Sequence, residues 1–174
     1  MDSFEFFREQ YLQENARREQ MNNEISTPMA IITGEVTAIF ILTTSFSYKC
    51  SIVALVLFIV FTLLSLASLV ISAAYLSKVF VTNFPYFRAA NSFSYQQVAL
   101  PNNLHDWYLQ LDAFFNGLQL PAGQSAVQLT EDEFKRGLRQ QFADFAAHNA
   151  QINDRKRQDI FYSKFTILYS AAFL

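Results

Sequence analysis

The feature that most constrains this chain is an uninterrupted apolar run between Lys49 and Lys78. About 28 residues follow one another there without a charge, a glycine or a proline. As a helix they would measure roughly 40 Å, whereas the hydrocarbon core of a bilayer is about 30 Å thick. We therefore expect a membrane protein, in which each buried polar group and each charge needs a physical reason.

The average composition hides this run. With 52% hydrophobic residues, 16% charged residues and a net charge of -2, the whole chain has the composition of an ordinary globular domain. Residues 25–77 nevertheless contain only two charged side chains, Glu35 and Lys49. The single cysteine, Cys50, excludes an intrachain disulfide, and we expect neither a metal site nor a cofactor.

A second apolar stretch precedes the uncharged run. The motif Ser26-Thr-Pro28 has the form of a helix N-cap and first turn, and about 20 mostly apolar residues follow it. The connection around Lys49 is too short to reach another part of the membrane, so the sequence predicts an antiparallel hairpin of two spans over residues 28–78. Alternatively, Pro28 kinks one continuous helix that runs from residue 3 to residue 47.

Residues 1–27 are predicted to form an amphipathic helix. Both signs of charge occur before any apolar run, so this segment does not resemble a cleaved secretion signal. Its aromatic stripe either packs on a partner helix or lies on the bilayer surface. Basic residues lie outside both ends of the hairpin, whereas its turn holds only Lys49, so both flanks should be cytoplasmic. The flanking basic residues are Arg8, Arg17, Arg18, Lys78 and Arg88.

Glu35 is the most unusual residue of the first span. A carboxylate there costs roughly 2.5–3.5 kcal/mol on insertion scales unless it is protonated, paired or in contact with water. Counted from the turn, it should lie level with residues 62–65 of the returning helix. That helix carries a stripe of hydroxyl groups at Thr62, Ser65, Ser68 and Ser72.

Two interpretations of Glu35 and of this stripe remain open. In the first, they are packing residues that hold helices together, or Glu35 extends toward the cytoplasmic interface. In the second, they form a pore or ion-sensing site in an oligomer. The hydroxyls of Thr33, Thr37 and Thr44 are expected to bond carbonyls of their own helix.

Residues 79–159 should form a cytosolic helical region. Up to about residue 103, aromatic residues mixed with Pro and Asn predict an ordered loop or a short pair of strands, near the headgroups or in a small core. Apolar residues at helical spacing then predict a helix over residues 104–118, ended by Gly117, Pro121 and Gly123. We expect four of its aromatic residues to be candidates for binding a partner: Trp107, Tyr108, Phe114 and Phe115.

The last predicted helix is long. Thr130 and Glu133 have the spacing of a capping box, and neither glycine nor proline follows Gly137. An apolar stripe in its first half can pack against the helix over residues 104–118. Its basic middle, residues 153–157, is typical of a cytoplasmic stop before a membrane rather than of a nucleic-acid contact.

Residues 160–174 should be the start of a third membrane segment. After Lys164 about 10 apolar residues follow, roughly 15 Å of helix. They belong either to a longer span or to a half-inserted or partner-bound terminal helix. The predicted fold is therefore an all-α membrane protein with a two-span hairpin, a small cytosolic helical region and a partial third span.

Three motifs carry a family resemblance: Asn15-Ala-Arg-Arg18, Ser26-Thr-Pro28 at the entry to the hairpin, and Asn149-Ala-Gln-Ile-Asn153 leading to Lys156. Together they resemble the bacterial membrane effectors of anti-phage defence that include the SLATT-type, Pycsar transmembrane and retron-associated transmembrane proteins. The resemblance implies a small inner-membrane protein that stays quiet until infection is sensed. It then oligomerises and permeabilises the membrane, which kills or arrests the cell.

The resemblance also implies the partners: the lipid bilayer, further copies of the chain and a source of the signal. That signal is a cyclic nucleotide or another cue, or release from a complex of reverse transcriptase and noncoding DNA. No nucleotide-binding motif is recognisable, which favours control by a protein or ribonucleoprotein such as a retron reverse transcriptase complex, without direct nucleic-acid binding.

Two other functions remain open: a membrane-anchored adaptor that recruits a cytosolic partner, and a small channel subunit. Two spans cannot enclose water, so any pore needs several copies. The sequence shows no constellation of nucleophile, base or metal ligands, and we do not expect an enzyme.

Overall fold

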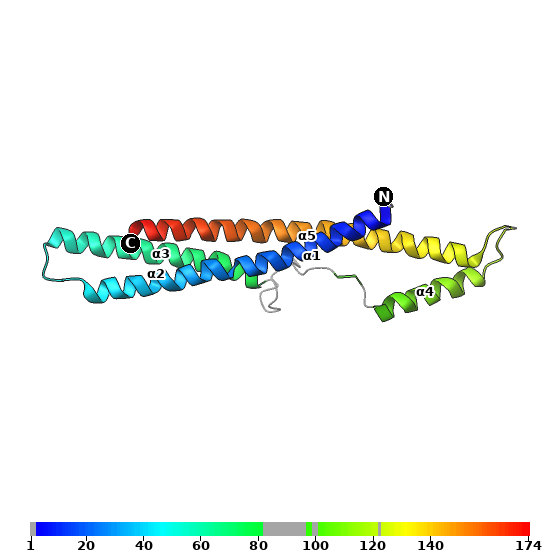
Figure 1. Ribbon diagram of the computed structural model, residues 1–174, viewed down its shortest axis with the longest axis horizontal. Coiled ribbons are helices and arrows are strands. Elements are labelled where there is room, and N and C mark those ends of the chain that lie inside the picture. The colour runs from blue at the N-terminus through cyan, green and yellow to red at the C-terminus, as the bar shows by residue number, and fades with distance from the viewer. Residues whose placement is uncertain (1–2, 82–96, 99–100, 122) are drawn as a thin grey trace. The chain divides into compact units, whose positions relative to one another are not determined.

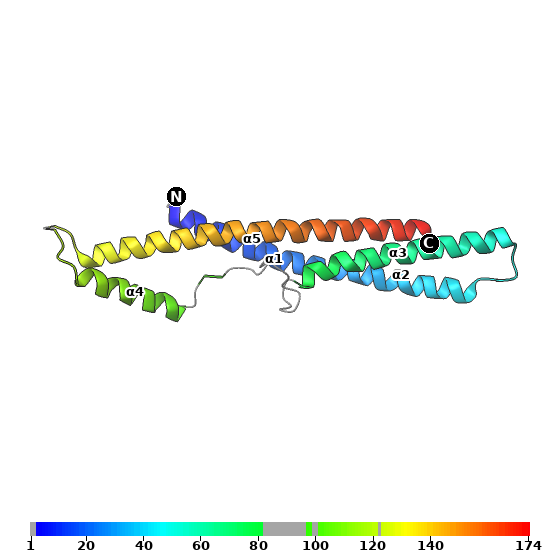
Figure 2. The same ribbon diagram turned by 180° about the vertical axis from the view of Figure 1, so that it is seen from behind.

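The computed structural model describes residues 3–81, 97–98, 101–121 and 123–174, and in these residues it has five α-helices (Figures 1 and 2). The helices are α1 (Ser3–Glu24), α2 (Ser26–Ser45), α3 (Ile52–Val81), α4 (Pro101–Asn116) and α5 (Ala126–Phe173). The all-α prediction is thus confirmed for the described residues. Most of the predicted loop or strand pair after residue 79 lies outside them.

Contacts divide the chain into two compact units, and α1 and α5 contribute to both. The first unit comprises Met1–Arg17 and Tyr95–Ile152, and the second comprises Arg18–Ser94 and Asn153–Leu174. The 48-residue length of α5 confirms the prediction that the last helix continues without a break after Gly137.

The junction of α1 and α2 is almost helical. Ile25 has the dihedral angles φ -69° and ψ -28° of an α-helix, and Pro28 lacks the N–H that would bond the carbonyl of Glu24. This supports the alternative of one helix interrupted at Pro28. The predicted N-cap is wrong, because the Ser26 hydroxyl donates to the carbonyl of Asn23 at 2.8 Å instead of accepting from a helix N–H.

The second unit is a bundle in which α2, α3 and the C-terminal part of α5 run side by side (Figures 1 and 2). Its fully buried positions recur every seven residues, as in the left-handed packing of coiled coils. On α3 these positions include Ser65, Ser72 and Val79, and on α5 they include Ser163 and Ser170. The inward face therefore mixes small hydroxyl residues with aliphatic ones.

The outer surface of the same bundle is apolar. Phe40 on α2, Val70 on α3 and Leu168 on α5 are each at least 67% exposed, and many other large aliphatic and aromatic side chains also point outward. Within the described residues, two helical stretches are long and apolar enough to cross a membrane, Ser3–Ser45 and Ile52–Val79. Apolar residues outside and hydroxyls inside are the arrangement expected of helices surrounded by lipid.

The first unit is held together by aromatic contacts on α5. The rings of Trp107 and Tyr108 on α4 lie 4.9 Å and 5.4 Å from the ring of Phe134. The rings of Phe4 and Tyr11 on α1 each lie 5.6 Å from that of another α5 residue, Phe142. The aromatic residues of α1 and the apolar stripe of α5 thus pack within this chain.

The predicted capping box at Thr130 is wrong. The helix α5 begins four residues earlier, at Ala126, and the Thr130 hydroxyl donates to the carbonyl of Ala126 at 2.9 Å. The predicted stop of the preceding helix is confirmed, since α4 ends at Asn116 and Gly123 turns the chain with φ +95°. This dihedral angle is readily adopted by glycine and rarely by other residues.

Candidate functional site

The candidate site is a row of four buried serines in the second unit, here called the serine seam: Ser65, Ser72, Ser163 and Ser170. The Ser65 and Ser170 hydroxyl oxygens are 2.8 Å apart, and those of Ser72 and Ser163 are 2.7 Å apart. Ser72 Oγ is also 3.1 Å from the carbonyl oxygen of Ser163. All four side chains are fully buried. The two pairs fix an antiparallel register between α3 and α5.

The other predicted hydroxyls of α3 have different surroundings. Ser68 donates to the carbonyl of Leu64 on its own helix at 2.9 Å. Thr62 lines a cavity of about 150 Å³ together with Ser65, Ile39 and Phe173. The predicted stripe is therefore divided, because Ser65 and Ser72 bind α5 whereas Thr62 and Ser68 do not reach it by a hydrogen bond that the structure describes.

Glu35 lies on the inward, partly buried face of α2. Its neighbour one turn earlier, Ile32, packs against a cluster that contains Leu76 and Ile160, and Ile39 lines the cavity beside Ser65. Glu35 therefore lies between the levels of Ser65 and Leu76 on α3, beyond the predicted residues 62–65. The offset arises because α3 begins beyond the end of α2 (Figure 1).

One carboxylate oxygen of Glu35 is unsatisfied. Within the described part of the chain, Oε2 is buried and has no hydrogen-bond partner. A buried carboxylate oxygen without a partner is costly, above all at the depth of a membrane span. The threonines of the same helix behave as predicted, since Thr33, Thr37 and Thr44 donate to carbonyls three or four residues earlier.

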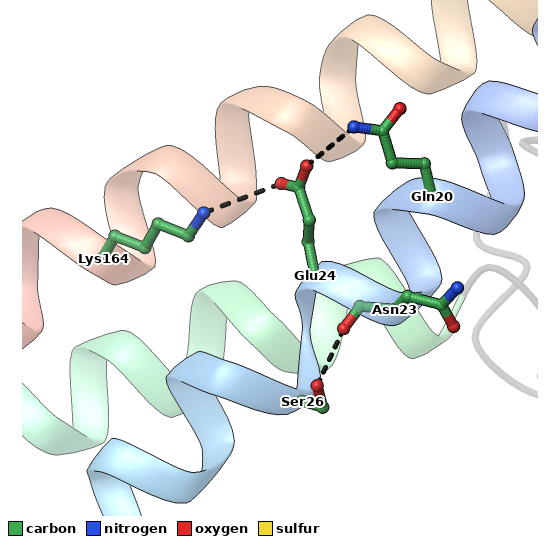
Figure 3. A network of polar contacts seen from close by, with 5 residues as sticks. All are labelled: Gln20, Asn23, Glu24, Ser26 and Lys164. Atoms are coloured by element: carbon green, nitrogen blue, oxygen red, sulfur yellow. Dashed lines mark hydrogen bonds and ion pairs between the residues drawn. The ribbon is translucent and has the colours of Figure 1, made fainter.

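A network of polar contacts joins the end of α1 to α5 and to the first residue of α2 (Figure 3). Lys164 on α5 lies 3.6 Å from Glu24 on α1, and Gln20 donates to the same carboxylate at 3.3 Å. Both charged side chains are nearly half exposed, so the ion pair contributes at most about 1 kcal/mol to stability. From Phe165 to Leu174 the chain carries no ionisable side chain except the phenol of Tyr169.

Within the basic segment 153–157, predicted to be a cytoplasmic stop before a membrane, Lys156 is buried. Only 4% of this residue is exposed, and burial, followed by the positive charge of Arg18, lowers its pKa to about 8. Burial also raises the pKa of Asp159, against the opposing effect of Lys78. Arg155 and Arg157 are exposed, as a stop sequence requires. The overlooked signal was spacing, since Lys156, Ser163 and Ser170 are seven residues apart.

The four aromatic candidates for partner binding separate into two classes. Trp107 and Tyr108 pack on Phe134 and are partly buried, so they belong to the interior of the first unit. Phe115 is partly buried as well. Phe114 is 59% exposed, and Leu109 and Leu118 near it in the sequence are also exposed. Of the four candidates, Phe114 therefore presents the most exposed side chain, and partner binding by all four stays a prediction.

The described residues contain no cluster of three or more His, Cys, Asp or Glu side chains that could hold a metal ion. Comparison of the chain with protein-family models, with curated proteins and with solved structures finds no match.

Proposed function

We propose that this protein is a membrane-inserted effector of bacterial antiviral defence that oligomerises and permeabilises the inner membrane when it is triggered. The observation that carries the proposal is a polar interior within an apolar exterior. Hydroxyl groups and one unsatisfied carboxylate oxygen lie inside a bundle whose outer surface is aliphatic and aromatic. A chain that packs this way has polar groups available to line water in an assembly of several copies.

The energetics of helix packing in lipid support this proposal. Lipid tails are as apolar as leucine, so no hydrophobic force holds apolar helices together in a bilayer. Hydrogen bonds between membrane helices average about 0.6 kcal/mol in measured cases. Two serine pairs can therefore be exchanged for contacts with other copies at little cost, and water in a pore would satisfy Glu35.

The proposal is tested by measuring the membrane potential of bacteria that express the protein during challenge with a panel of phages. The potential should collapse in cells that carry the protein and persist in cells that lack it. A Glu35→Ala variant should alter conductance or toxicity more than Glu9→Ala, which changes an exposed carboxylate on α1. An intact potential under conditions that protect the culture counts decisively against permeabilisation, and equal effects of the two substitutions remove Glu35 from the pore.

A second candidate function, a membrane-anchored adaptor, is favoured by the exposed apolar side chains near α4. Phe114 and Leu118 are 59% and 46% exposed, which suits contact with a partner protein. An adaptor needs the hairpin only as an anchor. Replacing residues 28–77 by an unrelated neutral hairpin should then preserve activity, and loss of activity in a correctly inserted chimera rejects the adaptor.

A further inference from the structure

Two of the hydroxyls that would line a pore, those of Ser65 and Ser72, are closed off in this structure. Ser65 and Ser72 have no exposed surface, and each is hydrogen-bonded to a serine of α5. Neither can contact water while α5 occupies this position. The arrangement of the second unit is therefore that of a sealed protein, and α5 provides the seal.

The part of α5 that forms the seal, residues 160–173, is here called the terminal segment. Its inward face offers α3 the hydroxyls of Ser163 and Ser170, with Ile160 and Ile167 beside them. Its outward face is apolar, with Phe161, Phe165 and Leu168 between 47% and 67% exposed. In lipid the hydrophobic effect does not favour the contact between the terminal segment and α3. Hydrogen bonds, the ion pair of Lys164 with Glu24 and close packing, including the ring contact of Tyr75 with Tyr162, therefore hold the segment in place.

The hydrogen bonds between the terminal segment and α3 can also be replaced by bonds to other groups. Serine hydroxyls both donate and accept, so Ser65 and Ser72 can form equivalent bonds with water or with serines of another copy. The same helix contributes residues 126–152 to the first unit. A partner bound to that part of α5 acts on a helix that continues without a break into the terminal segment.

We propose that the terminal segment of α5 is an autoinhibitory seal, which keeps the protein closed while its serines pair with those of α3 and which is withdrawn on activation. This inference rests on the proposed membrane-permeabilising function and adds its regulation. In the resting state the serines of α3 and α5 are paired. In the active state the hydroxyls of α3 face water or other copies of the chain.

The first test weakens the seal without any trigger. The double variant Ser163→Leu, Ser170→Leu places bulky side chains where the structure has hydroxyl contacts. The full chain is reconstituted into vesicles of phosphatidylethanolamine and phosphatidylglycerol that contain a self-quenched dye. We expect dye release at least tenfold faster than with the wild type. The control Phe165→Leu, Leu168→Phe changes only the outward face and should release dye at the wild-type rate.

The second test locks the seal and covers the case in which the leucine variant does not fold. Ser72→Cys and Ser163→Cys are combined with Cys50→Ser, which removes the only native cysteine. The 2.7 Å separation of the native hydroxyl oxygens places the side chains close enough for a disulfide. During phage challenge, cells in which the disulfide has formed should keep their membrane potential. Reduction of the disulfide should restore the collapse of the potential that is seen with Cys50→Ser alone.

The outcomes separate the seal from the function. If vesicles with a folded and inserted leucine variant leak no faster than those with the wild type, or if the cross-linked protein still depolarises cells, the seal is overturned while permeabilisation stands. If Cys50→Ser and the wild type both fail to depolarise challenged cells, the proposed function itself fails. Fast leakage together with a reversible block by the disulfide supports the seal.

Discussion

Gly137 shows how a single missing side chain positions an aromatic residue. A Cβ atom at this position would lie 2.7 Å from Cζ2 of Trp107, closer than two carbon atoms can pack. The indole cannot withdraw easily, because it also packs on Phe134. Alanine is favoured over glycine in a helix by about 1 kcal/mol, whereas overpacking costs about 1–3 kcal/mol. We therefore expect Gly137→Ala to lower the free energy of unfolding by about 1 kcal/mol.

The matched control for this prediction is Gly34, the other glycine inside a helix. Among the described residues no atom lies within 4 Å of a Cβ placed there. Gly34→Ala should therefore leave the stability unchanged or raise it slightly. Unfolding of both variants in mixed micelles, followed by circular dichroism, makes the comparison. Equal effects of the two substitutions would show that Trp107 does not occupy the space beside Gly137.

Lys156 makes the stability depend on pH. Its pKa falls from 10.5 to about 8 through burial and then through Arg18, so between these values the unfolded chain binds more protons than the folded one. Stability should therefore rise as the pH increases from 8 to 10.5, by up to about 3 kcal/mol. Below pH 8 both states bind the proton, and the full penalty of burying the charge remains.

Substitution of Lys156 identifies the source of this pH dependence. Lys156→Met keeps the approximate length of the side chain and removes the ammonium group, and with it the titration. The stability of the variant should therefore change little between pH 8 and pH 10.5. Lys135→Met, at an exposed position, serves as the control. A wild-type slope that persists in Lys156→Met would assign the titration to another group.

At the level of elements, substitutions of the α3 serines can distinguish a hydrogen bond between two helices from one within a single helix. Ser72→Ala leaves the Ser163 hydroxyl without its partner on α3, and we expect a loss of about 0.5–1.5 kcal/mol. In the double variant with Ser163→Ala the losses should be less than additive, because both changes remove the same pair. Ser68→Ala should cost less, since Ser68 bonds only its own helix. Additive losses in reversible unfolding would show that the pair does not form.

The helices themselves could be predicted from the sequence, whereas their ends and their pairing could not. Uninterrupted apolar runs predict helices because few other structures satisfy the backbone in lipid. A capping motif does not fix where a helix begins, because the same hydroxyl can cap the helix or bond a carbonyl inside it. The Thr130 hydroxyl donates to the carbonyl of Ala126, in a helix that had already begun. Ser163 and Ser170 look like small residues in an apolar run, and only their seven-residue spacing, matched by Ser65 and Ser72, indicates a partner.

At the level of the whole molecule, the division into two units escaped prediction because it depends on contacts between distant parts of the chain. Phe4 and Phe142 are far apart in sequence, and their contact belongs to the first unit. The ion pair of Glu24 and Lys164 belongs to the second. Periodicity within one helix indicates that a face is buried but not which helix covers it. The contacts of Trp107 and Tyr108 with Phe134 of α5 could not be predicted for the same reason.

The orientation of the chain in the membrane can be tested with its single native cysteine. Cys50 is exposed and lies in the turn that we propose, from the distribution of basic residues, to face the outside of the cell. A membrane-impermeant maleimide should therefore label the wild-type protein in intact spheroplasts. In a Cys50→Ser background, Glu9→Cys on α1 should be labelled only after the membrane is permeabilised.

This measurement decides more than topology. If Cys50 is shielded in intact cells and the cysteine at position 9 is labelled from outside, a partner in the cytoplasm has no access to α1, α4 or the first half of α5. Control of the terminal segment by such a partner would then be impossible, even if the serine seam forms as described. Labelling of Cys50 alone instead agrees with a cytoplasmic first unit, which the proposed control by a cytoplasmic partner requires.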